Sequence, residues 1–360
     1  MRILLFISSM ESGGAERVMA ILCNKLAERN HEIYLATNTD RSFAYSLCSD
    51  VHIISLYPSD YAKRSRLFRF FTLYSSIKEI AKKVKPEVIV SFMYTLNAKV
   101  LLATLGLRIP VIASERTTFD VRQSLLDRFR RLYINRLAAC VTVQTQHDYR
   151  YLGKRLPQKT VMPNPLDFPL RYNRTLKEKV VLTVGSVDRW EDKGFGILIG
   201  IWKDLVKKHS DWQLVIAGGG NEKNFECLKS VVVRCGVTDS VQLLGFRKDV
   251  CELMYKSAVF VLASKYEGMP NCLLEAMSQG CACVSFDCVT GPAEMITEGC
   301  SGILVENQNV QKMTFTLHKV MQDEELRNML SEGALQEVTR YLPDNIITRW
   351  EALLNECVKR

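Results

Sequence analysis

The sequence predicts an α/β protein built from two doubly wound domains, and three observations support that fold class. Its 360 residues are more than twice the roughly 150 of a typical single domain. Short apolar runs alternate with segments of helical period along both halves of the chain. Because the apolar runs leave no polar face, they indicate parallel strands covered by helices on both sides of a sheet.

The first domain is expected over residues 1–168. It opens with a buried strand at 2–8 and a helix at 14–30, whose apolar side chains recur on one face. Further strands are expected near 32–37, 87–92, 110–114 and 139–144, and helices near 67–85, 95–106 and 121–136.

The second domain is expected over residues 169–342, after a proline-rich linker at 162–174. Its strands are expected at 180–185, 212–217, 241–244, 259–263 and 282–286, and its helices at 194–209, 271–279 and 308–340. Residues 343–360 are expected to pack back on the first domain. Doubly wound domains bind ligands at the carboxyl ends of their strands, so we expect the two domains to face each other across a ligand-binding cleft.

The composition is typical of a soluble globular protein, with 47% hydrophobic and 24% charged residues. Arg108 and Pro110 interrupt the longest apolar stretch, which falls short of the roughly 20 residues of a membrane-spanning helix. The apolar run before Ser8 is too short for a signal peptide, so a cytoplasmic location is expected. The cysteines include no Cys-x-x-Cys pair, which favours reduced, buried thiols over a metal site.

The formal net charge of +9 comes entirely from the first half of the chain. Residues 1–170 contain 25 lysines and arginines against 14 acids, whereas residues 171–360 contain 23 against 25. A strongly basic half suits an anionic partner, such as a membrane surface, a nucleic acid or a phosphorylated substrate.

Two segments of the basic half, 63–85 and 122–136, combine cations with aromatic side chains. Their basic residues are Lys63, Arg64, Arg66, Arg69, Lys78, Lys82, Lys83, Lys85, Arg122, Arg128, Arg130, Arg131 and Arg136. A solvated helix face with aromatic residues in the core is the alternative. Because no nucleic-acid-binding module accompanies these segments, an anionic membrane surface is the expected partner.

A glycine pair follows the first strand, at Gly13 and Gly14, and opens a helix. Free backbone N–H groups and the positive end of the helix dipole suit a phosphate there. The segment does not have the Gly-x-Gly-x-x-Gly spacing of a dinucleotide fold, and a simple tight turn is the alternative.

The second domain opens in the same way, with a strand that ends at Gly185 and a loop that contains Arg189 and Lys193. A planar guanidinium and a compact ammonium suit the two phosphates of a diphosphate. Charges on a solvated loop are the alternative.

The most informative segment runs from Ser264 to Met277. Glu267 lies in a Gly-Pro loop at a strand end, and Glu275 lies in the apolar helix that follows. A carboxylate in such a helix needs a polar partner, which ribose hydroxyls or a structural ion pair would supply. Glu294 begins the next helix, where an acid in the first turn is the simpler interpretation.

Taken in order, these motifs resemble those of the retaining glycosyltransferases of family 4, which have the GT-B architecture of two Rossmann-like domains. The resemblance covers nearly the whole chain. The matching segments are Gly13-Gly14-Ala15-Glu16, Pro163-Asn164-Pro165, 185–194, 244–246, 267–275 and 285–294.

The resemblance implies a role for each site residue. The glycine pair approaches the donor diphosphate, Arg189 and Lys193 neutralise it, and Glu275 holds the ribose. The donor-binding residues are Gly13, Gly14, Gly185, Gly245, Phe246, Gly268, Met269, Pro270, Asn271 and Glu275. The catalytic residues are Glu267, Lys193, Arg189 and Arg116.

The sequence departs from the family pattern at three places. Many members have an arginine soon after the second-domain glycine, where this chain has Ser186 and Val187 before the later Arg189. Arg116 stands near the position of a histidine that contacts the donor sugar in many members. After the helix at 271–279, family members usually have Gly-x-Pro, whereas this chain has Gly280-Cys281-Ala282. This difference affects a turn.

No Asp-x-Asp occurs in the chain, so a metal-independent reaction without cofactors is expected, in which fixed cations stabilise the leaving group. The resemblance implies retention by front-face attack. It also implies a UDP-linked hexose or N-acetylhexosamine donor and a lipid-linked saccharide acceptor, in capsular, exopolysaccharide or O-antigen synthesis on the inner face of the plasma membrane.

Three alternatives stay open from the sequence. A nucleotide-sugar epimerase shares the architecture, because fold alone does not choose the reaction. A binding protein without turnover is the second, although the two glutamates argue against it. A glycosyltransferase with a soluble acceptor is the third.

Overall fold

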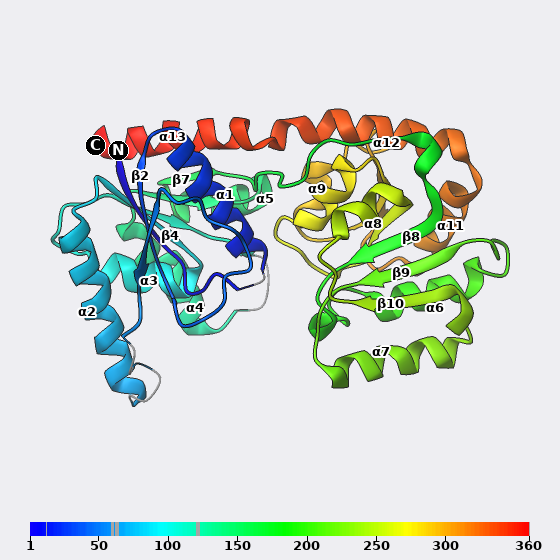
Figure 1. The fold of residues 1–360 in the computed structure, drawn as a ribbon, viewed down its shortest axis with the longest axis horizontal. Coiled ribbons are helices and arrows are strands. Elements are labelled where there is room, and N and C mark those ends of the chain that lie inside the picture. The colour runs from blue at the N-terminus through cyan, green and yellow to red at the C-terminus, as the bar shows by residue number, and fades with distance from the viewer. Residues whose placement is uncertain (12, 59–60, 62–64, 120–122, 360) are drawn as a thin grey trace. The chain divides into compact units, whose positions relative to one another are not determined.

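The protein is described by a computed structural model that covers residues 1–11, 13–58, 61, 65–119 and 123–359. It forms two compact units (Figure 1). The N-terminal unit comprises Met1–Pro165 together with Tyr341–Arg360, and the C-terminal unit comprises Leu166–Arg340.

A parallel seven-stranded sheet forms the centre of the N-terminal unit, in the order β3-β2-β1-β4-β5-β6-β7. Its strands are β1 (Arg2–Phe6), β2 (Glu32–Thr37), β3 (Val51–Ser55), β4 (Val88–Phe92), β5 (Val111–Ser114), β6 (Cys140–Val143) and β7 (Lys159–Val161). Its helices are α1 (Gly14–Glu28), α2 (Arg66–Val84), α3 (Tyr94–Ala103), α4 (Leu125–Leu132), α5 (Gln146–Leu152) and α13 (Pro343–Lys359).

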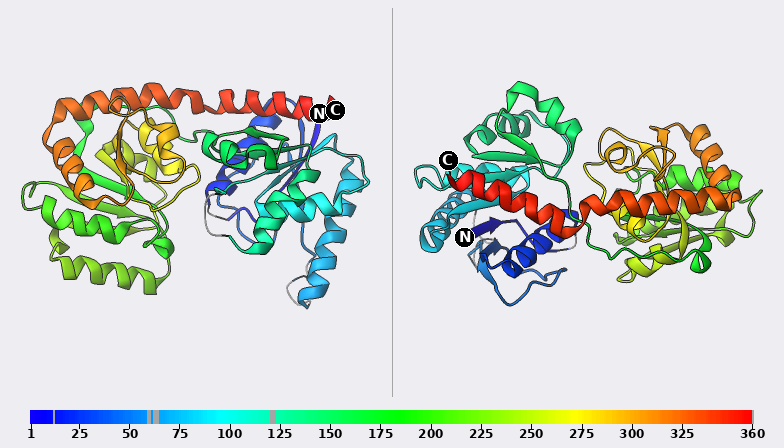
Figure 2. Two further views of the ribbon diagram at one scale, coloured as in Figure 1. Left: turned by 180° about the vertical axis from the view of Figure 1, so that it is seen from behind. Right: turned by 90° about the horizontal axis from the view of Figure 1, so that it is seen from above.

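Both faces of this sheet are buried, as the apolar character of its strands requires. Ile3 and Leu5 of β1 belong to the core formed with α1 and α13. Leu4 and Phe6, which point to the opposite face, belong to the core formed with α2 and α3. The helices therefore lie on both sides of the sheet, which the two views of Figure 2 also show for this unit.

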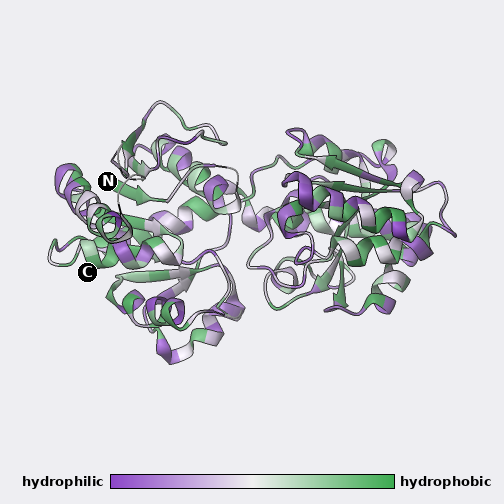
Figure 3. Ribbon diagram, turned by 90° about the horizontal axis from the view of Figure 1, so that it is seen from below, coloured by the Kyte–Doolittle hydropathy of each residue, from purple (hydrophilic) through white to green (hydrophobic). Residues whose placement is uncertain are grey.

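The C-terminal unit has a parallel six-stranded sheet in the order β10-β9-β8-β11-β12-β13. Its strands are β8 (Glu178–Val184), β9 (Gln213–Ala217), β10 (Val241–Gly245), β11 (Ser257–Leu262), β12 (Ala282–Asp287) and β13 (Ile303–Glu306). Its α-helices are α6 (Phe195–Leu205), α7 (Glu222–Cys235), α8 (Val250–Lys256), α9 (Asn271–Ser278), α10 (Pro292–Met295), α11 (Val310–Gln322) and α12 (Glu324–Val338). Figure 3 shows the strands of both units coloured mainly as hydrophobic, with polar residues on the helices.

These two sheets confirm the predicted doubly wound α/β fold class. The sequence analysis missed β3, β7 and β13, each of which lies at the edge of a sheet. These three strands contain exposed or only partly buried residues, so they lack the continuous apolar run of a central strand.

The helix expected over 308–340 is wrong as a single element, because α11 ends before Asp323 and α12 begins after it. Asp323 has an extended backbone, and its side chain accepts a hydrogen bond of 2.9 Å from the backbone N–H of Leu326. An aspartate in this role caps the start of a new helix.

The strand orders place a topological switch point in each sheet. In the N-terminal unit the chain order reverses between β1 and β4, and in the C-terminal unit between β8 and β11. Ligands of open α/β sheets bind beyond the carboxyl ends of the strands at such points. Among the described residues, no helix combines the length and apolar character needed to span a bilayer.

Candidate active site

The loops that follow β8 and β11 meet at the switch point of the C-terminal unit, and each contributes one predicted site residue. The ammonium Nζ of Lys193 lies 2.7 Å from Oε1 of Glu267. These side chains are only 16% and 12% exposed. Two residues 74 positions apart in the sequence thus form one buried ion pair.

Backbone and hydroxyl contacts hold these loops in place. The backbone N–H of Lys265 donates to the carbonyl of Asp192 at 2.8 Å, which joins the two loops. The hydroxyl of Thr290, from the loop after β12, donates to the carbonyl of Glu267. Gly291 has a φ of +90°, and a Cβ there would lie 2.4 Å from the carbonyl oxygen of Gly268. Three strand ends therefore fix the position of the Glu267 loop.

Lys193 stays charged in this setting. Burial lowers its pKa, but the opposite charge of Glu267 and the hydrogen bond to it more than offset this effect, so the net shift is upward. Gly185 lies beside the lysine stem, since a Cβ at Gly185 would come within 3.3 Å of Lys193 Cδ. The glycine leaves room for the lysine to reach Glu267.

Helix α9 starts directly after the Glu267 loop and buries the second predicted glutamate. Glu275 is 5% exposed, and Met269 is 8% exposed. Pro270 precedes the helix and no side chain caps its first turn. Burial raises the pKa of Cys272 to about 12, so this thiol is neutral beside the ion pair. The segment Gly268 to Asn271 thus connects the Glu267 loop to the helix that buries Glu275.

Arg189 lies at the rim of this site. Its Nε is 3.3 Å from Oδ2 of Asp192, its side chain is 52% exposed, and its guanidinium lies 5.8 Å from the centre of the Tyr266 ring. Lys193, by contrast, is buried against Glu267. Of the two predicted phosphate-binding cations, Lys193 is the one that the fold holds in place.

Gly245 and Phe246 lie at the end of β10, two strands from β8. The carbonyl of Gly245 accepts a 2.8 Å hydrogen bond from Gly218 at the end of β9. Phe246 is 65% exposed, and a Cβ on Gly219 would lie 3.6 Å from its Cβ. An exposed aromatic ring at a strand end offers a flat surface on which a base can stack.

The remaining predicted residues belong to the N-terminal unit. Gly13 and Gly14 begin α1 after β1, and Arg116 follows β5. Arg116 is 8% exposed, its Nη2 donates to Oδ1 of Asn164, and its guanidinium carbon lies 4.7 Å from the centre of the Phe92 ring. Burial lowers the pKa of Arg116 to about 9, against the opposing effect of a nearby glutamate.

Comparisons with known proteins identify the family of both units. The family described as "Glycosyl transferases group 1" matches residues 170–337, and "Glycosyltransferase Family 4" matches residues 12–168. The chain belongs to the family 4 glycosyltransferases.

Curated relatives match this glycosyltransferase over almost its full length. It is 28% identical to an amylovoran biosynthesis glycosyltransferase of Erwinia amylovora, with 96% of each chain covered. It is 27% identical to an α-1,4-N-acetyl-D-galactosaminyltransferase of Campylobacter jejuni, with 99% of each chain covered. The name of the latter includes a diphospho-undecaprenol-linked saccharide.

Solved structures confirm the GT-B fold of the glycosyltransferase. A sucrose-phosphate synthase from Thermosynechococcus elongatus aligns with a TM-score of 0.84 at 17% identity, covering 99% of this chain and 98% of that one. Anabaena HepE in complex with UDP-glucose aligns with a TM-score of 0.79 at 18% identity, covering 99% and 100%. At these identities the likeness shows the fold alone.

Sequence reasoning missed a buried ion pair beside Arg116. Glu115 is 1% exposed and Arg131 is 2% exposed, with 2.8 Å between Oε2 and Nε. Asn135 donates to the other carboxylate oxygen at 2.8 Å. Arg131 also donates to the carbonyls of Thr117 and Thr118, so the pair holds the loop that carries Arg116. The sequence places Arg131 on a basic surface, and its burial corrects that expectation.

Sequence reasoning also missed Asp188, one residue before Arg189. Its Oδ1 accepts hydrogen bonds from the backbone and side-chain nitrogens of Asn221 at 2.8 and 2.6 Å, and from the side chain of Asn224 at 2.9 Å. Asn221 caps α7. The carboxylate therefore ties the loop after β8 to the loop after β9.

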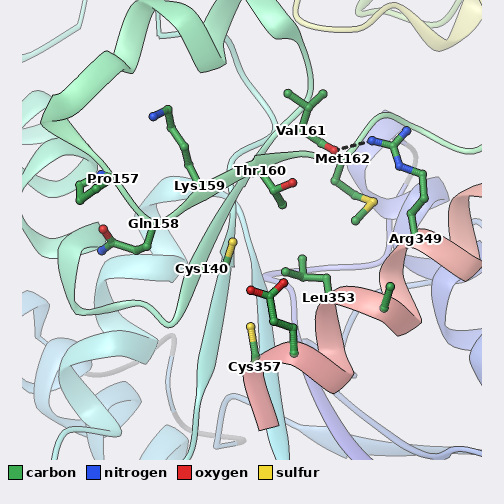
Figure 4. A pocket seen from close by; sticks show the side chains of 12 residues that line it. Cys140, Pro157, Gln158, Lys159, Thr160, Val161, Met162, Arg349, Leu353 and Cys357 are labelled. Atoms are coloured by element: carbon green, nitrogen blue, oxygen red, sulfur yellow. Dashed lines mark hydrogen bonds between the residues drawn. The ribbon is translucent and has the colours of Figure 1, made fainter. Parts of the chain in front are cut away.

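A pocket in the N-terminal unit lies elsewhere, between β7 and α13 (Figure 4). Its lining includes Lys159, Leu353 and Cys357, and the guanidinium of Arg349 donates to the carbonyl of Val161 at 2.7 Å. The residues that line it include none of the predicted site residues.

Proposed function

We propose that this glycosyltransferase moves a hexose or N-acetylhexosamine from a UDP-linked donor to a lipid-linked saccharide acceptor, with retention and without a metal ion. The observation that carries the proposal is the buried Lys193–Glu267 pair at the β8–β11 switch point, followed in the chain by α9 with its buried Glu275. A fixed ammonium stabilises the negative charge that builds on a departing diphosphate. The two carboxylates suit the hydroxyls of a sugar and a ribose.

Relatives support the substrate classes. The Campylobacter relative is named for an N-acetylgalactosamine transfer to a diphospho-undecaprenol-linked saccharide. HepE, a protein of the same fold, binds UDP-glucose. We accordingly assign the donor to the C-terminal unit, with Gly245 and Phe246 at the base, and the acceptor to the N-terminal unit.

The test of this function is a thermal-shift panel of nucleotide sugars followed by turnover. A ligand that binds only the folded state raises the melting temperature, by an amount set by its concentration relative to Kd. We expect UDP-sugars to give the largest rise. Addition of a lipid-diphosphate saccharide should then produce a larger saccharide together with UDP. Release of free sugar or formation of an epimer without acceptor would support an epimerase instead.

Turnover is expected to be equal in excess EDTA and in magnesium. The chain has no Asp-x-Asp to bridge a divalent ion to a diphosphate, and Lys193 supplies a fixed positive charge at the site. Product formation measured with and without chelator checks this. A loss of activity in EDTA that magnesium or manganese specifically restores would contradict metal independence.

Exposed apolar and basic side chains support a membrane-binding role for the N-terminal unit. Helices α2 and α4 both pack on α3. Large apolar side chains on them are exposed: Phe68, Phe70, Phe71, Leu125, Leu126 and Phe129. Arg69, Lys82 and Lys83 of α2 are also exposed. The predicted residues Lys63, Arg64 and Arg122 lie outside the described residues, as does the side chain of Arg66.

We expect the protein to bind anionic vesicles reversibly and in a salt-sensitive way, on the inner face of the plasma membrane. Basic residues near an anionic surface contribute about 1 kcal/mol each. Replacing Arg69 and Lys82 by glutamate together with Phe71 by serine should therefore weaken binding more than tenfold in liposome sedimentation. Phe315→Ser on α11 removes a similarly exposed aromatic ring from the other unit and is the control. Equal binding to neutral and anionic vesicles, or none at low salt, would favour a soluble acceptor.

A further inference from the structure

Residues 133–159 form a basic and aromatic surface at the amino ends of β6 and β7 in the N-terminal unit. The turn η2 (Ile134–Leu137) precedes β6, and α5 with the turn η3 (Gly153–Arg155) precedes β7. Because β6 and β7 are parallel, both turns lie at the same end of the sheet. Arg116 and the predicted glycine pair follow β5 and β1, so they lie at the opposite end. This 133–159 surface is therefore separate from the predicted site residues.

The cations of the 133–159 surface lack a counter-charge within the protein. They are Arg136, Arg150, Lys154, Arg155 and Lys159. The one acid of the segment, Asp148, is 2% exposed and accepts hydrogen bonds from Thr118 and Phe119 in the interior. Among the residues that the structure describes, none of these five cations forms an ion pair with a carboxylate. A group of like charges without internal neutralisation favours an anionic partner.

Hydrogen bonds to the backbone hold the two turns together. Nε and Nη2 of Arg136 donate to the carbonyl of Arg155 at 3.2 and 3.0 Å. The side chain of Gln158 donates in return to the carbonyl of Arg136 at 2.9 Å. Nζ of Lys159 donates to the carbonyl of Gly153 at 2.7 Å. The cations of both turns are thus fixed next to one another rather than spread over independent loops.

Three of the cations lie over exposed tyrosine rings. Arg136 lies over Tyr133, Arg155 over Tyr151 and Lys159 over Tyr149, with 5.3, 5.2 and 4.4 Å from the charged group to the ring centre. The three rings are 56%, 37% and 39% exposed. An aromatic face is electron-rich, so it attracts a cation and also the weakly positive C–H groups of a sugar ring. Each pair therefore offers a stacking surface for a sugar and, beside it, a donor for an acidic substituent.

The composition of the surface favours a saccharide over a membrane or a nucleic acid. Surfaces that insert into a membrane carry large apolar anchors, whereas Leu137 is the one large aliphatic side chain exposed in this segment. Residues 133–159 also form none of the modules that bind nucleic acids. Tyrosine, with an apolar ring and a polar hydroxyl, suits the mixed apolar and polar faces of a sugar. The chain belongs to a family that acts on sugars.

We propose that the 133–159 surface binds a saccharide chain that carries carboxylates. The tyrosine rings stack on sugar rings, and the arginines and lysines bind the carboxylates between them. This goes beyond the proposed function, because the surface lies at the end of the sheet opposite Arg116 and needs no donor or acceptor in the reaction site. A chain held there keeps saccharides at a high local concentration around the enzyme.

The test titrates the full-length protein by calorimetry with three oligomers of similar length. Oligogalacturonate carries a carboxylate on every sugar, dextran oligosaccharides are neutral, and oligoglutamate carries carboxylates without sugar rings. We expect oligogalacturonate to bind at least tenfold more tightly than either of the others, and more weakly as salt is raised. Equal affinity for oligoglutamate, or no binding of oligogalacturonate at low salt, would overturn the proposal.

Variants locate the binding on this surface. Arg150→Glu combined with Lys154→Glu should weaken oligogalacturonate binding more than tenfold, because bonds to charged groups are lost and repulsion is added. Tyr151→Leu, which removes the ring but keeps an apolar side chain, should weaken it about threefold or more. The control combines Lys223→Glu with Lys312→Glu, two exposed positions of the C-terminal unit with the same change in net charge. It should change the affinity less than twofold.

The remaining outcomes also decide. An equal loss in the control would show that net charge, not this surface, binds the oligomer. A larger loss of binding to anionic vesicles than to oligogalacturonate in the Arg150 and Lys154 variant would assign the surface to the membrane, and tighter binding of single-stranded DNA would assign it to nucleic acid. Melting temperatures identify variants that do not fold, for which Arg150→Gln with Lys154→Gln replaces the charge reversal. Absence of UDP binding by the wild type would overturn the proposed function and leave this inference standing.

Discussion

Lys193→Ala is expected to weaken UDP binding about ten- to hundredfold, since hydrogen bonds to charged groups contribute about 1.5 to 3 kcal/mol. The substitution removes the cation that the β8 loop holds against Glu267. It also leaves Glu267 with a buried and unneutralised charge, which adds repulsion toward an incoming diphosphate. Calorimetric titration of UDP, with the melting temperature recorded to show that the variant is folded, measures the effect.

Two further variants make this result specific. Lys265→Ala removes an exposed lysine from the adjoining loop and should change the affinity less than twofold. Glu275→Gln should lose affinity to a similar degree as Lys193→Ala, because a neutral amide is a weaker acceptor for ribose hydroxyls. Wild-type affinity in folded Lys193→Ala and Glu275→Gln would show that the donor site lies elsewhere.

Arg131→Met is expected to destabilise the protein by about 3 to 5 kcal/mol, the usual cost of removing one partner of a buried ion pair. The change leaves the carboxylate of Glu115 buried at 1% exposure, with Asn135 as its remaining hydrogen-bond donor. The carbonyls of Thr117 and Thr118 also lose their donor. The midpoint of urea denaturation, followed by tryptophan fluorescence, reports the loss.

Arg128→Met is the matched control on the same helix, one turn before Arg131. Its side chain is exposed, and exposed substitutions usually change stability by less than about 0.5 kcal/mol. Similar denaturation midpoints for the two variants would mean that the Glu115–Arg131 pair does not hold the loop. At temperatures where Arg131→Met remains folded, we also expect reduced turnover, because the loop it anchors carries Arg116.

The central strands were predictable because they are buried on both faces. Val88–Phe92 and Ser257–Leu262 are short and almost continuously apolar, and runs of this length between helical segments are typical of buried parallel strands. The edge strand Val51–Ser55 has exposed residues at His52 and Ile53 and therefore lacks this signature. The spacing of apolar residues also could not predict the boundary between α11 and α12, because that boundary consists of one residue, the capping Asp323.

The candidate site was predictable to the extent that its residues lie at the ends of central strands. Lys193 and Glu267 follow β8 and β11, which are neighbours, so the sheet order alone brings them together. Arg131 shows the opposite case: it lies in a basic segment with Arg128 and Arg130, and nothing local indicates that it pairs with Glu115 in the interior. Two opposite charges 16 residues apart in the sequence do not by themselves indicate an ion pair. The pair becomes recognisable only in the folded structure, where both side chains are buried.

Helix α13 supplies Ile346, Trp350 and Leu354 to the core of the N-terminal unit, although the whole C-terminal unit precedes it in the chain. During synthesis on a ribosome, the first sheet therefore emerges long before the helix that covers one of its faces. Until α13 arrives, the apolar face that receives Trp350 is open to chaperones and to other nascent chains. The C-terminal unit, which is continuous in sequence, can close its own core earlier. The unit whose sheet is translated first is thus the one whose core can be completed last.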